Sequence, residues 1–353
     1  MTILLTGAAG LLGTAVVQRL IAGGVRSLRC LVRPGSTAAR LRALAAEHGP
    51  DVLTIACGTL TSARDVACAV EGAQVVVHMA ASTRGAPADM FLNTVVGTQR
   101  LLEAIPGAAV QRLVLASSLA VYGLARLPPG SVIGEETPLD PFPWRRDVYA
   151  HTKIRQEQLV AAAAGPAGIT AVVLRPGPIY GPDSAELPGR VGLLIPGLLL
   201  HLGGDTPLPL TYIDNCADAF CLALHDRVPA GAYNVIDDRF PTAAQYLRRY
   251  QREVRHVRTL RLPYFATRLL SRTVERCHVA SNGQIPLAMT TYRTANLWGR
   301  HLYDTARLKS LGWQQPVPTE DALRTTFAAL RRRYNRIGGL EPGERVERTD
   351  VHR

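Results

Sequence analysis

A tyrosine and a lysine four positions apart, Tyr149 and Lys153 in the segment YAHTK, are the residues best suited to moving a proton. On a helix this spacing places both side chains on one face, about one turn apart. A free phenol has a pKa of ~10, whereas a neighbouring ammonium stabilises the phenolate and lowers that pKa toward the neutral range. Ser118 follows a predicted strand over residues 112–116, so its hydroxyl can reach the same pocket. We therefore predict that Ser118, Tyr149 and Lys153 form one catalytic acid–base group.

A glycine-rich turn at residues 7–13, GAAGLLG, has the composition of a phosphate-binding loop. A strand is predicted before it and a helix after it, which is the context that gives such a motif meaning. Gly7 allows a tight turn, Gly10 lets the backbone approach a pyrophosphate, and Gly13 lets the helix pack on the strand. The helix N-terminus adds N–H donors and a positive dipole end. The loop predicts a bound dinucleotide in contact with Gly7, Gly10, Leu11, Leu12 and Gly13.

The end of the second predicted strand, residues 28–32, indicates which dinucleotide binds. In many NAD-binding chains a carboxylate there binds the ribose 2′-hydroxyl. This chain instead continues with Arg33-Pro34-Gly35-Ser36. Arg33 can pair with a 2′-phosphate, and Ser36 can hydrogen-bond to it. The sequence therefore favours NADP(H), with NAD(H) as the alternative.

Strands and helices alternate through the first half of the chain and must position these groups. The predicted strands are residues 2–6, 28–32, 52–56, 74–78, 112–117 and 170–174, and the predicted helices include 14–22, 90–104 and 149–164. This alternation predicts an α/β fold with a doubly wound parallel sheet, a Rossmann domain covered by helices on both faces. The carboxyl edge of such a sheet is where ligands bind.

Repeated prolines after Arg175 mark the start of a smaller, interleaved C-terminal substrate lobe. Residues 210–214 and 232–236 are predicted to be strands that return to the main body, with a helix over 217–224 between them. We expect a dinucleotide-binding domain at residues 1–180, to which residues 205–240 return. The substrate lobe then consists of residues 181–204 and 241–335, and the polar residues 336–353 are predicted to form a mobile tail.

The composition, with 47% hydrophobic and 19% charged residues in a chain of 353, is that of a globular protein with more than one lobe. The net charge is +12, but the arginines accompany no known nucleic-acid-binding module, so no nucleic-acid partner is expected. The six cysteines lack metal-ligand spacing, and no metal site is expected. The apolar stretches are too short to span a membrane and no signal peptide is evident, which predicts no integral membrane segment and a cytoplasmic location.

The motifs occur together in the order found in one family. Besides TGAAGLLG and YAHTK, the chain carries HMAA at 78–81, NTVVGT at 93–98, RPGPIYGP at 175–182 and YIDN at 212–215. Over most of residues 1–330 it resembles the extended short-chain dehydrogenase/reductases, also called the NAD-dependent epimerase/dehydratase family. The resemblance implies that Ser118 orients the substrate oxygen, Tyr149 shuttles its proton and Lys153 holds the nicotinamide ribose. It also implies cofactor contacts from Ala80, Ala81, Asn93 and Pro176, and substrate contacts from Arg175, Tyr180 and Asp214; the His78 imidazole is expected to have no catalytic role.

Departures from the family pattern narrow the expected reaction. Sugar 4,6-dehydratases of this family carry an Asp-Glu pair just after the catalytic hydroxyl, where this chain has Leu119 and Ala120, so dehydration is not expected. Thr59 also departs from the family pattern, because it stands where other members usually have an Asp that contacts the adenine of the cofactor. We favour a carbonyl reductase or alcohol dehydrogenase that acts on a small molecule as a homodimer.

Three other functions stay open at this stage. Residues 135–141 resemble the nucleotide-sugar branch, which leaves an epimerase with tightly bound NAD as the first alternative. A dinucleotide-binding protein without turnover is the second. The basic and apolar stretch at residues 258–276 suggests a third alternative, a membrane-associated enzyme for lipid-like alcohols, although such a stretch more often covers the substrate pocket.

Overall fold

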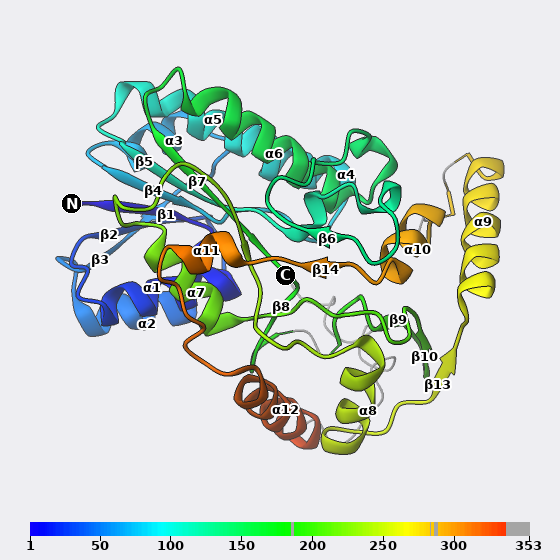
Figure 1. Ribbon diagram of the computed structural model, residues 1–353. Coiled ribbons are helices and arrows are strands. Elements are labelled where there is room, and N and C mark those ends of the chain that lie inside the picture. Colours follow the sequence, from blue (N-terminus) through cyan, green and yellow to red (C-terminus); the bar gives the residue numbers. More distant parts are fainter. Residues whose placement is uncertain (185–186, 283, 286–288, 337–353) are drawn as a thin grey trace.

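The protein, described by a computed structural model over residues 1–184, 187–282, 284–285 and 289–336, is built around one large sheet (Figure 1). Seven strands lie in the order β12-β7-β5-β4-β1-β2-β3, and every neighbouring pair is parallel. They are β1 (Ile3–Thr6), β2 (Leu28–Val32), β3 (Leu53–Cys57), β4 (Val75–His78), β5 (Arg112–Ala116), β7 (Thr170–Pro176) and β12 (Gly231–Val235). The strand order reverses between β1 and β4, as in doubly wound Rossmann folds, and the predicted fold class is confirmed.

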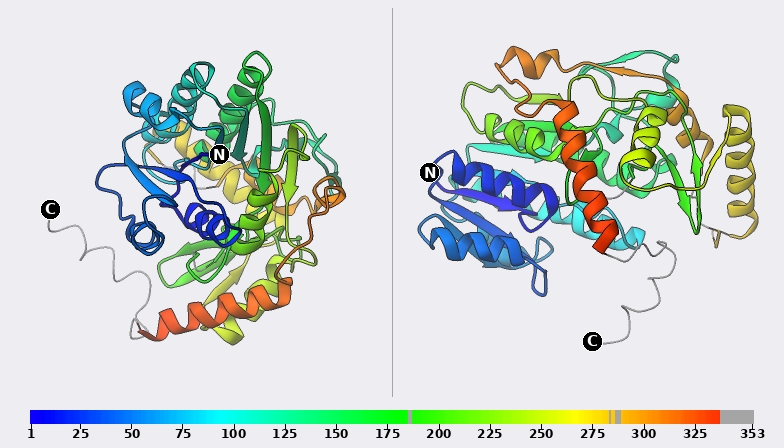
Figure 2. Two further views of the ribbon diagram at one scale, coloured as in Figure 1. Left: turned by 90° about the vertical axis from the view of Figure 1, so that its left-hand side faces the viewer. Right: turned by 90° about the horizontal axis from the view of Figure 1, so that it is seen from below.

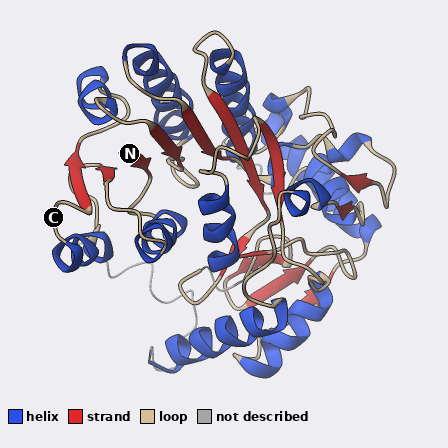
Figure 3. Cartoon of the chain, turned by 60° about the vertical axis from the view of Figure 1, so that its left-hand side comes forward, coloured by secondary structure: helices blue, strands red, loops and turns tan. Residues whose placement is uncertain are grey.

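Helices cover both faces of this sheet, as Figure 3 shows. Those on one face are α1 (Leu11–Ala22), α2 (Ala39–His48) and α7 (Ile213–Leu222), and those on the other are α3 (Ala63–Val70), α5 (Gly97–Ala104) and α6 (Val148–Ala164). Successive side chains of a strand point to opposite faces. Accordingly Ile3 and Leu5 lie in the core with α1, whereas Leu4 lies in the core with α3. The apolar runs of the strands are thus explained by burial on both sides.

The helix predicted over residues 90–104 is observed in three pieces. It consists of α4 (Pro87–Phe91), a π-helical segment at Leu92–Val96 and α5. The π-helical segment contains Asn93, whose Nδ2 donates to the Asp89 carbonyl at 2.7 Å. Single wide turns of this kind are frequent at functional sites.

The smaller lobe follows the proline-rich segment. It holds a three-stranded sheet, β13-β10-β9, and the helices that follow it in the chain. The elements are β9 (Gly192–Ile195), β10 (Leu198–His201), β13 (Thr259–Arg261), α8 (Ala243–Glu253), α9 (Tyr264–Ala280), α10 (Thr291–Trp298) and α12 (Thr319–Arg336). Short elements complete the fold: β6 (Val132–Ile133) pairs with β14 (Leu302–Tyr303), β8 (Ile179–Tyr180) pairs with β11 (Thr211–Tyr212), and α11 (Ala306–Ser310) precedes α12.

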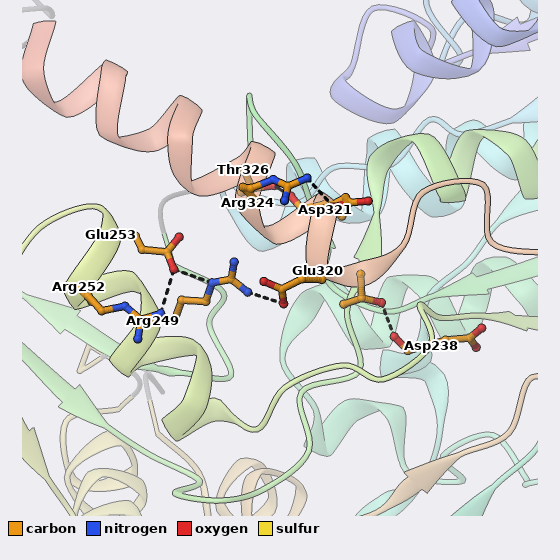
Figure 4. A network of polar contacts seen from close by, with 10 residues as sticks. Asp238, Arg249, Arg252, Glu253, Glu320, Asp321, Arg324 and Thr326 are labelled. Carbon is orange, nitrogen blue, oxygen red and sulfur yellow. Dashed lines mark hydrogen bonds and ion pairs between the residues drawn. The ribbon is translucent and has the colours of Figure 1, made fainter.

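The last helix, α12, is fixed against α8, and the two lie side by side in both views of Figure 2. Arg249 of α8 donates to Glu320 of α12 and to Glu253 of its own helix, both at 2.8 Å (Figure 4). The Arg249 guanidinium also lies over the Phe327 ring, 5.5 Å from its centroid. These contacts attach the end of the described chain to the lobe.

One predicted strand is wrong in its extent. Residues 210–214 were expected to form a strand that returns to the main body, but β11 covers only Thr211 and Tyr212, which pair with β8. Helix α7 already begins at Ile213, because the Asn215 side chain bonds Asp237 and the Val317 backbone and so holds the first turn in place. The other returning segment, β12, does join the main sheet beside β7. The tail predicted at 336–353 lies outside the described residues except for Arg336, the last residue of α12.

Candidate active site

The start of helix α6 places Tyr149 and Lys153 at the carboxyl edge of the main sheet. Asp147 caps this helix, since its carboxylate accepts a hydrogen bond from the Ala150 N–H at 3.0 Å. Strand β5 ends at Ala116, and Ser118 follows in extended conformation, with its hydroxyl accepting from the Ala120 N–H at 3.1 Å. The cap and the strand end therefore bring Ser118 and Tyr149, which are 31 positions apart in the chain, to one place.

A central cavity of about 610 Å³ contains the predicted catalytic group. Ser118, Tyr149 and Lys153 all line it. The predicted cofactor residues that line it too are Gly7, Gly10, Leu11, Leu12, Gly13, Ala81 and Pro176. The structure thus brings together, at one edge of the sheet, the glycine turn and the acid–base group.

A second cavity, of about 300 Å³, continues from the first along the ends of β2 and β3. The two cavities share Gly7, Gly10, Met79 and Ala81 as lining residues. Arg33, Ala80 and Asn93 line the second cavity, as do Ser36 and Thr59. A larger cavity, of about 1030 Å³, lies between α8 and α12 and is lined by none of the predicted site residues.

The glycine turn fits a dinucleotide. Gly7 has a φ of 74°, and a Cβ there would lie 2.7 Å from the Ala80 nitrogen. Gly10, in contrast, lines both cavities, and a Cβ there would meet only the Gly7 carbonyl oxygen, at 3.3 Å. A side chain at position 10 would therefore occupy open cavity space at the N-terminus of α1. That space, next to free helical N–H groups, is suited to a pyrophosphate.

The Ser118 hydroxyl lies close enough to Tyr149 to act on the pKa of its phenol. Burial raises the pKa of the Tyr149 phenol above its ordinary value, the Ser118 hydrogen bond opposes this, and the Asp147 charge adds to it. The sequence-based expectation of a lowered pKa is therefore wrong for this structure. The physical reason is burial of the phenol, while the Lys153 amine expected to lower the pKa donates to other partners.

The Lys153 amine lies among neutral acceptors. Its Nζ donates to the Ala116 carbonyl at 2.6 Å and to the Gln156 Oε1 at 2.8 Å. Burial lowers the pKa of Lys153 to about 7, although the more distant Glu157 charge raises it. The amine is consequently close to half-protonated at neutral pH.

A buried polar network that the sequence analysis did not predict supports Lys153. The Gln156 amide nitrogen lies 2.8 Å from Thr98 Oγ1 and 3.1 Å from His78 Nε2. His78 Nδ1 in turn lies 2.7 Å from Thr6 Oγ1. Burial, together with the Lys153 charge, lowers the pKa of His78 to about 3, so the imidazole is neutral. The only local signal for Gln156 was its position three residues after Lys153, on the same helix face.

The three residues predicted from the family resemblance to shape the substrate side do not line either cavity. Arg175 is buried and donates to both carboxylate oxygens of Glu157, at 3.0 and 2.7 Å. The buried Tyr180 hydroxyl donates to Asp237 at 2.8 Å. Asp214 is exposed in the first turn of α7. We leave these three residues out of the proposed site.

The fold and the cavity define a Rossmann protein that combines a dinucleotide loop with a hydroxyl, phenol and amine at the sheet edge. The chain belongs to the NAD dependent epimerase/dehydratase family, whose sequence profile matches residues 3–235.

Known proteins similar to this chain include both reductases and epimerases. A 4-hydroxy-2-methyl-3-oxo-4-farnesyl-3,4-dihydroquinoline-1-oxide ketoreductase from Stigmatella aurantiaca is 33% identical to this chain. The matched region covers 67% of this chain and 68% of the ketoreductase. A 2-alkyl-3-oxoalkanoate reductase from Shewanella oneidensis is 28% identical to this chain, and the matched region covers 92% of this chain and 85% of the reductase. Among solved structures, UDP-glucuronic acid 4-epimerase from Bacillus cereus, in complex with NAD, has a TM-score of 0.70 and 17% identity, and covers 95% of this chain and 100% of its own.

Proposed function

We propose that this protein is an NAD(P)H-dependent carbonyl reductase, and in the reverse direction an alcohol dehydrogenase, with Ser118, Tyr149 and Lys153 as its catalytic residues. The observation that carries the proposal is the single cavity that Ser118, Tyr149 and Lys153 line together with the glycine turn. When bound, the nicotinamide dinucleotide supplies or accepts the hydride.

Tyr149 is proposed to donate the proton that the carbonyl oxygen needs as it becomes a hydroxyl. Because burial raises the pKa of Tyr149, the phenol is fully protonated at neutral pH and ready to act as the acid. Ser118 is proposed to donate its one hydroxyl hydrogen to the substrate oxygen and so to orient it, while its own oxygen accepts from the Ala120 N–H. These features favour the reductive direction, in which the tyrosine starts out protonated.

Lys153 and the glycine turn are proposed to hold the dinucleotide. The family resemblance implies that the Lys153 amine contacts the nicotinamide ribose. Gly10, Leu11 and Leu12 at the start of α1 would hold the pyrophosphate through backbone N–H groups. Ala80, Ala81, Asn93 and Pro176 would complete the cofactor walls.

We infer that the cofactor is NADPH. Arg33 is exposed at the end of β2 and lines the second cavity together with Ser36. A guanidinium and a hydroxyl at this place suit a 2′-phosphate. The Asp65 carboxylate accepts from the Thr59 N–H at 2.9 Å and does not line the cavity, so it offers no competing partner for a 2′-hydroxyl.

The proposed substrate is a ketone with apolar substituents. Leu119, Ala120 and Ile179 line the central cavity, and its charged lining residues are Lys153 and Arg190. Such walls favour hydrocarbon over a phosphorylated sugar. Both reductases named above act, by their names, on 3-oxo compounds with alkyl or farnesyl groups. Leu119 and Ala120 also leave no carboxylate at this wall, which argues against 4,6-dehydration.

Turnover with 2-alkyl-3-oxoalkanoates tests this function. The purified protein is expected to contain no dinucleotide and to oxidise NADPH faster than NADH when a 2-alkyl-3-oxoalkanoate is added. Series of increasing alkyl length should show falling KM, because each added methylene is buried against apolar walls. Failure of every 3-oxo substrate to stimulate NADPH oxidation would contradict the proposal.

A nucleotide-sugar epimerase is the second candidate. It is favoured by Arg190, whose guanidinium at the central cavity is suited to a substrate phosphate, and by the fold shared with the Bacillus cereus epimerase. The same preparation separates the two functions, because an epimerase would copurify with NAD and interconvert UDP-sugars without net oxidation of NADPH. The family resemblance further favours a cytoplasmic homodimer.

A further inference from the structure

The outer side of helix α9 exposes large apolar side chains. Phe265, Leu269 and Val279 are 74%, 66% and 75% exposed. In Figure 1 this helix stands at the margin of the molecule, in yellow, beyond α10. Isolated apolar residues on a surface are ordinary, but three on one helix at helical spacing form an apolar stripe.

Three arginines lie on the same side of α9. Relative to Phe265, the exposed Arg268, Arg272 and Arg276 follow at spacings of three, seven and eleven residues, which returns them to one helix face. We call these six residues, Phe265, Arg268, Leu269, Arg272, Arg276 and Val279, the α9 face. The strand before the helix adds Leu260, which is also exposed, and Arg261.

The opposite side of α9 is fixed to the protein. Thr267 and Ser271 are buried there, and the Ser271 and Thr294 hydroxyls lie 2.7 Å apart, which links α9 to α10. Glu275, the acidic residue of the helix, accepts from both the backbone N–H and the hydroxyl of Thr291. The helix is therefore held with a defined face outward.

The charge on the α9 face is not neutralised within the described part of the chain. There, no ion pair involves Arg268, Arg272 or Arg276, whereas Arg19, Arg40 and Arg100 on other helices each pair with a carboxylate. A surface that is both basic and apolar is complementary to one that is both anionic and apolar. The interface of a bilayer containing anionic phospholipid has both properties.

We propose that the α9 face docks the protein peripherally on an anionic phospholipid membrane. The Phe265, Leu269 and Val279 side chains enter the headgroup boundary, and the arginine stems follow them while their guanidinium groups bind lipid phosphates. Within the described ranges no helix is long and apolar enough to cross the bilayer, so the contact is made at the surface. This inference goes beyond the proposed function and does not depend on it.

A second copy of the chain fits this face less well. In a two-fold interface the same patch meets itself, so three arginines would face three arginines without intervening carboxylates. A nucleic acid would match the arginines but would leave the apolar stripe facing phosphates and water.

The docked helix is connected to the wall of the proposed active site. Arg293 of α10 donates to the Gly189 carbonyl at 3.5 Å, and the next residue, Arg190, lines the central cavity. Docking through α9 therefore holds that wall close to the membrane, from which an apolar substrate can be drawn.

Vesicle flotation of the full chain tests the proposal. Vesicles of equal parts phosphatidylcholine and phosphatidylglycerol are expected to carry the protein upward, and vesicles of phosphatidylcholine alone are expected to leave it behind. Replacing all three arginines (Arg268→Gln, Arg272→Gln, Arg276→Gln) should weaken partitioning by about 100-fold, since each charge near an anionic surface contributes about fivefold. Phe265→Ser with Leu269→Ser should weaken it roughly tenfold or more.

A matched control distinguishes binding through the α9 face from binding through the general positive charge of the protein. The triple variant Arg26→Gln, Arg331→Gln, Arg332→Gln removes equal charge from exposed sites elsewhere and should retain flotation within about twofold. Thermal unfolding of each variant checks that it is folded. Absence of wild-type flotation, equal flotation of both arginine triples, or a change of oligomeric state in the Phe265/Leu269 variant without lipid binding would each overturn the proposal.

Discussion

Two buried cations, Arg175 on β7 and Lys153 on α6, lie in different environments. Arg175 makes two hydrogen bonds to the Glu157 carboxylate and a third to the Tyr122 hydroxyl at 3.0 Å. Among the residues that the structure describes, Lys153 donates to the Ala116 backbone carbonyl and to Gln156, which are both uncharged. Burial lowers the pKa of both, but at Arg175 the Glu157 hydrogen bond and charge outweigh it and raise the pKa. At Lys153 burial dominates, and the pKa is lowered to about 7.

The difference separates a structural cation from one available for chemistry. A charge that is fully paired in the interior fixes the packing around it and cannot be titrated near neutral pH. A buried amine with neutral partners can gain and lose its proton there, and it lines the cavity that Arg175 does not reach. We call Ser118, Tyr149 and Lys153 the Lys153 region, and Arg175 with its partner Glu157 the Arg175 region. We therefore expect substitutions in the Lys153 region to affect turnover and substitutions in the Arg175 region to affect stability.

The largest expected effect is on turnover, in the Lys153 region. Tyr149→Phe should lower kcat for carbonyl reduction by roughly 10²–10⁴-fold, because the proton donor is lost. The free energy of unfolding should change little, since Tyr149 is only partly buried. Steady-state kinetics and urea unfolding of one preparation measure both quantities. A Tyr149→Phe variant with a lowered free energy of unfolding and an unchanged kcat would contradict the assignment of this region to turnover.

In the Arg175 region, Glu157→Gln is expected to destabilise the protein by about 3 kcal/mol, because it leaves a buried guanidinium without its carboxylate. It also weakens the acceptor of the Ser117 hydroxyl. The control Glu103→Gln removes an exposed carboxylate paired with Arg100 and should lower the free energy of unfolding much less than Glu157→Gln. Equal losses in urea unfolding would show that the Glu157–Arg175 pair contributes no more than a surface pair.

The pH dependence of stability distinguishes the two cations. Native Lys153 releases its proton near pH 7, whereas the unfolded chain retains it to about pH 10.5. Between these values the unfolded state binds more protons, so this residue makes the free energy of unfolding rise with pH.

Two substitutions isolate that contribution. Lys153→Met should abolish the rise, and Gln156→Glu should reduce it, because a carboxylate bonded to Nζ keeps the amine protonated and makes the site resemble that of Arg175. Thermal unfolding at a series of pH values measures it. Wild type and Lys153→Met with parallel pH profiles would contradict the assigned state of the lysine.

The smallest expected effect concerns an exposed cation, Arg33. Arg33→Gln should raise KM for NADPH by roughly tenfold and leave KM for NADH nearly unchanged, because one charge-assisted contact to the 2′-phosphate is lost. Arg26→Gln, on the loop before β2, is the matched control and should change neither. A similar rise in KM for NADPH and for NADH would mean that Arg33 does not contact the 2′-phosphate.

The fold and the cofactor loop were predictable because their signals are local. Apolar runs of four to seven residues, the turn GAAGLLG and the segment YAHTK each define an element or a position within it, and the resemblance adds their order. The place of Ser118 followed from the end of β5 in the same way.

The remaining features depend on contacts between distant segments. Arg175 was expected at the substrate, but the register of β7 beside β5 and α6 turns it toward Glu157, 18 residues earlier. The raised pKa of Tyr149 arises mainly from burial, which no spacing in the chain reveals. The partners of Lys153, the Ala116 carbonyl and Gln156, are likewise known only from the structure. Similarly, α9 was recognisable as basic and apolar, but only the structure shows which of its residues face outward.

Transfer of deuterium from labelled cofactor tests the central claim most directly. With NADPH deuterated at the nicotinamide C4 position and a 2-alkyl-3-oxoalkanoate as substrate, mass spectrometry should find deuterium on the new carbinol carbon of the product. Tyr149→Phe should bind NADPH but form this product at a greatly reduced rate. A product that carries no cofactor deuterium, or equal product formation by the variant, would contradict hydride transfer assisted by Tyr149.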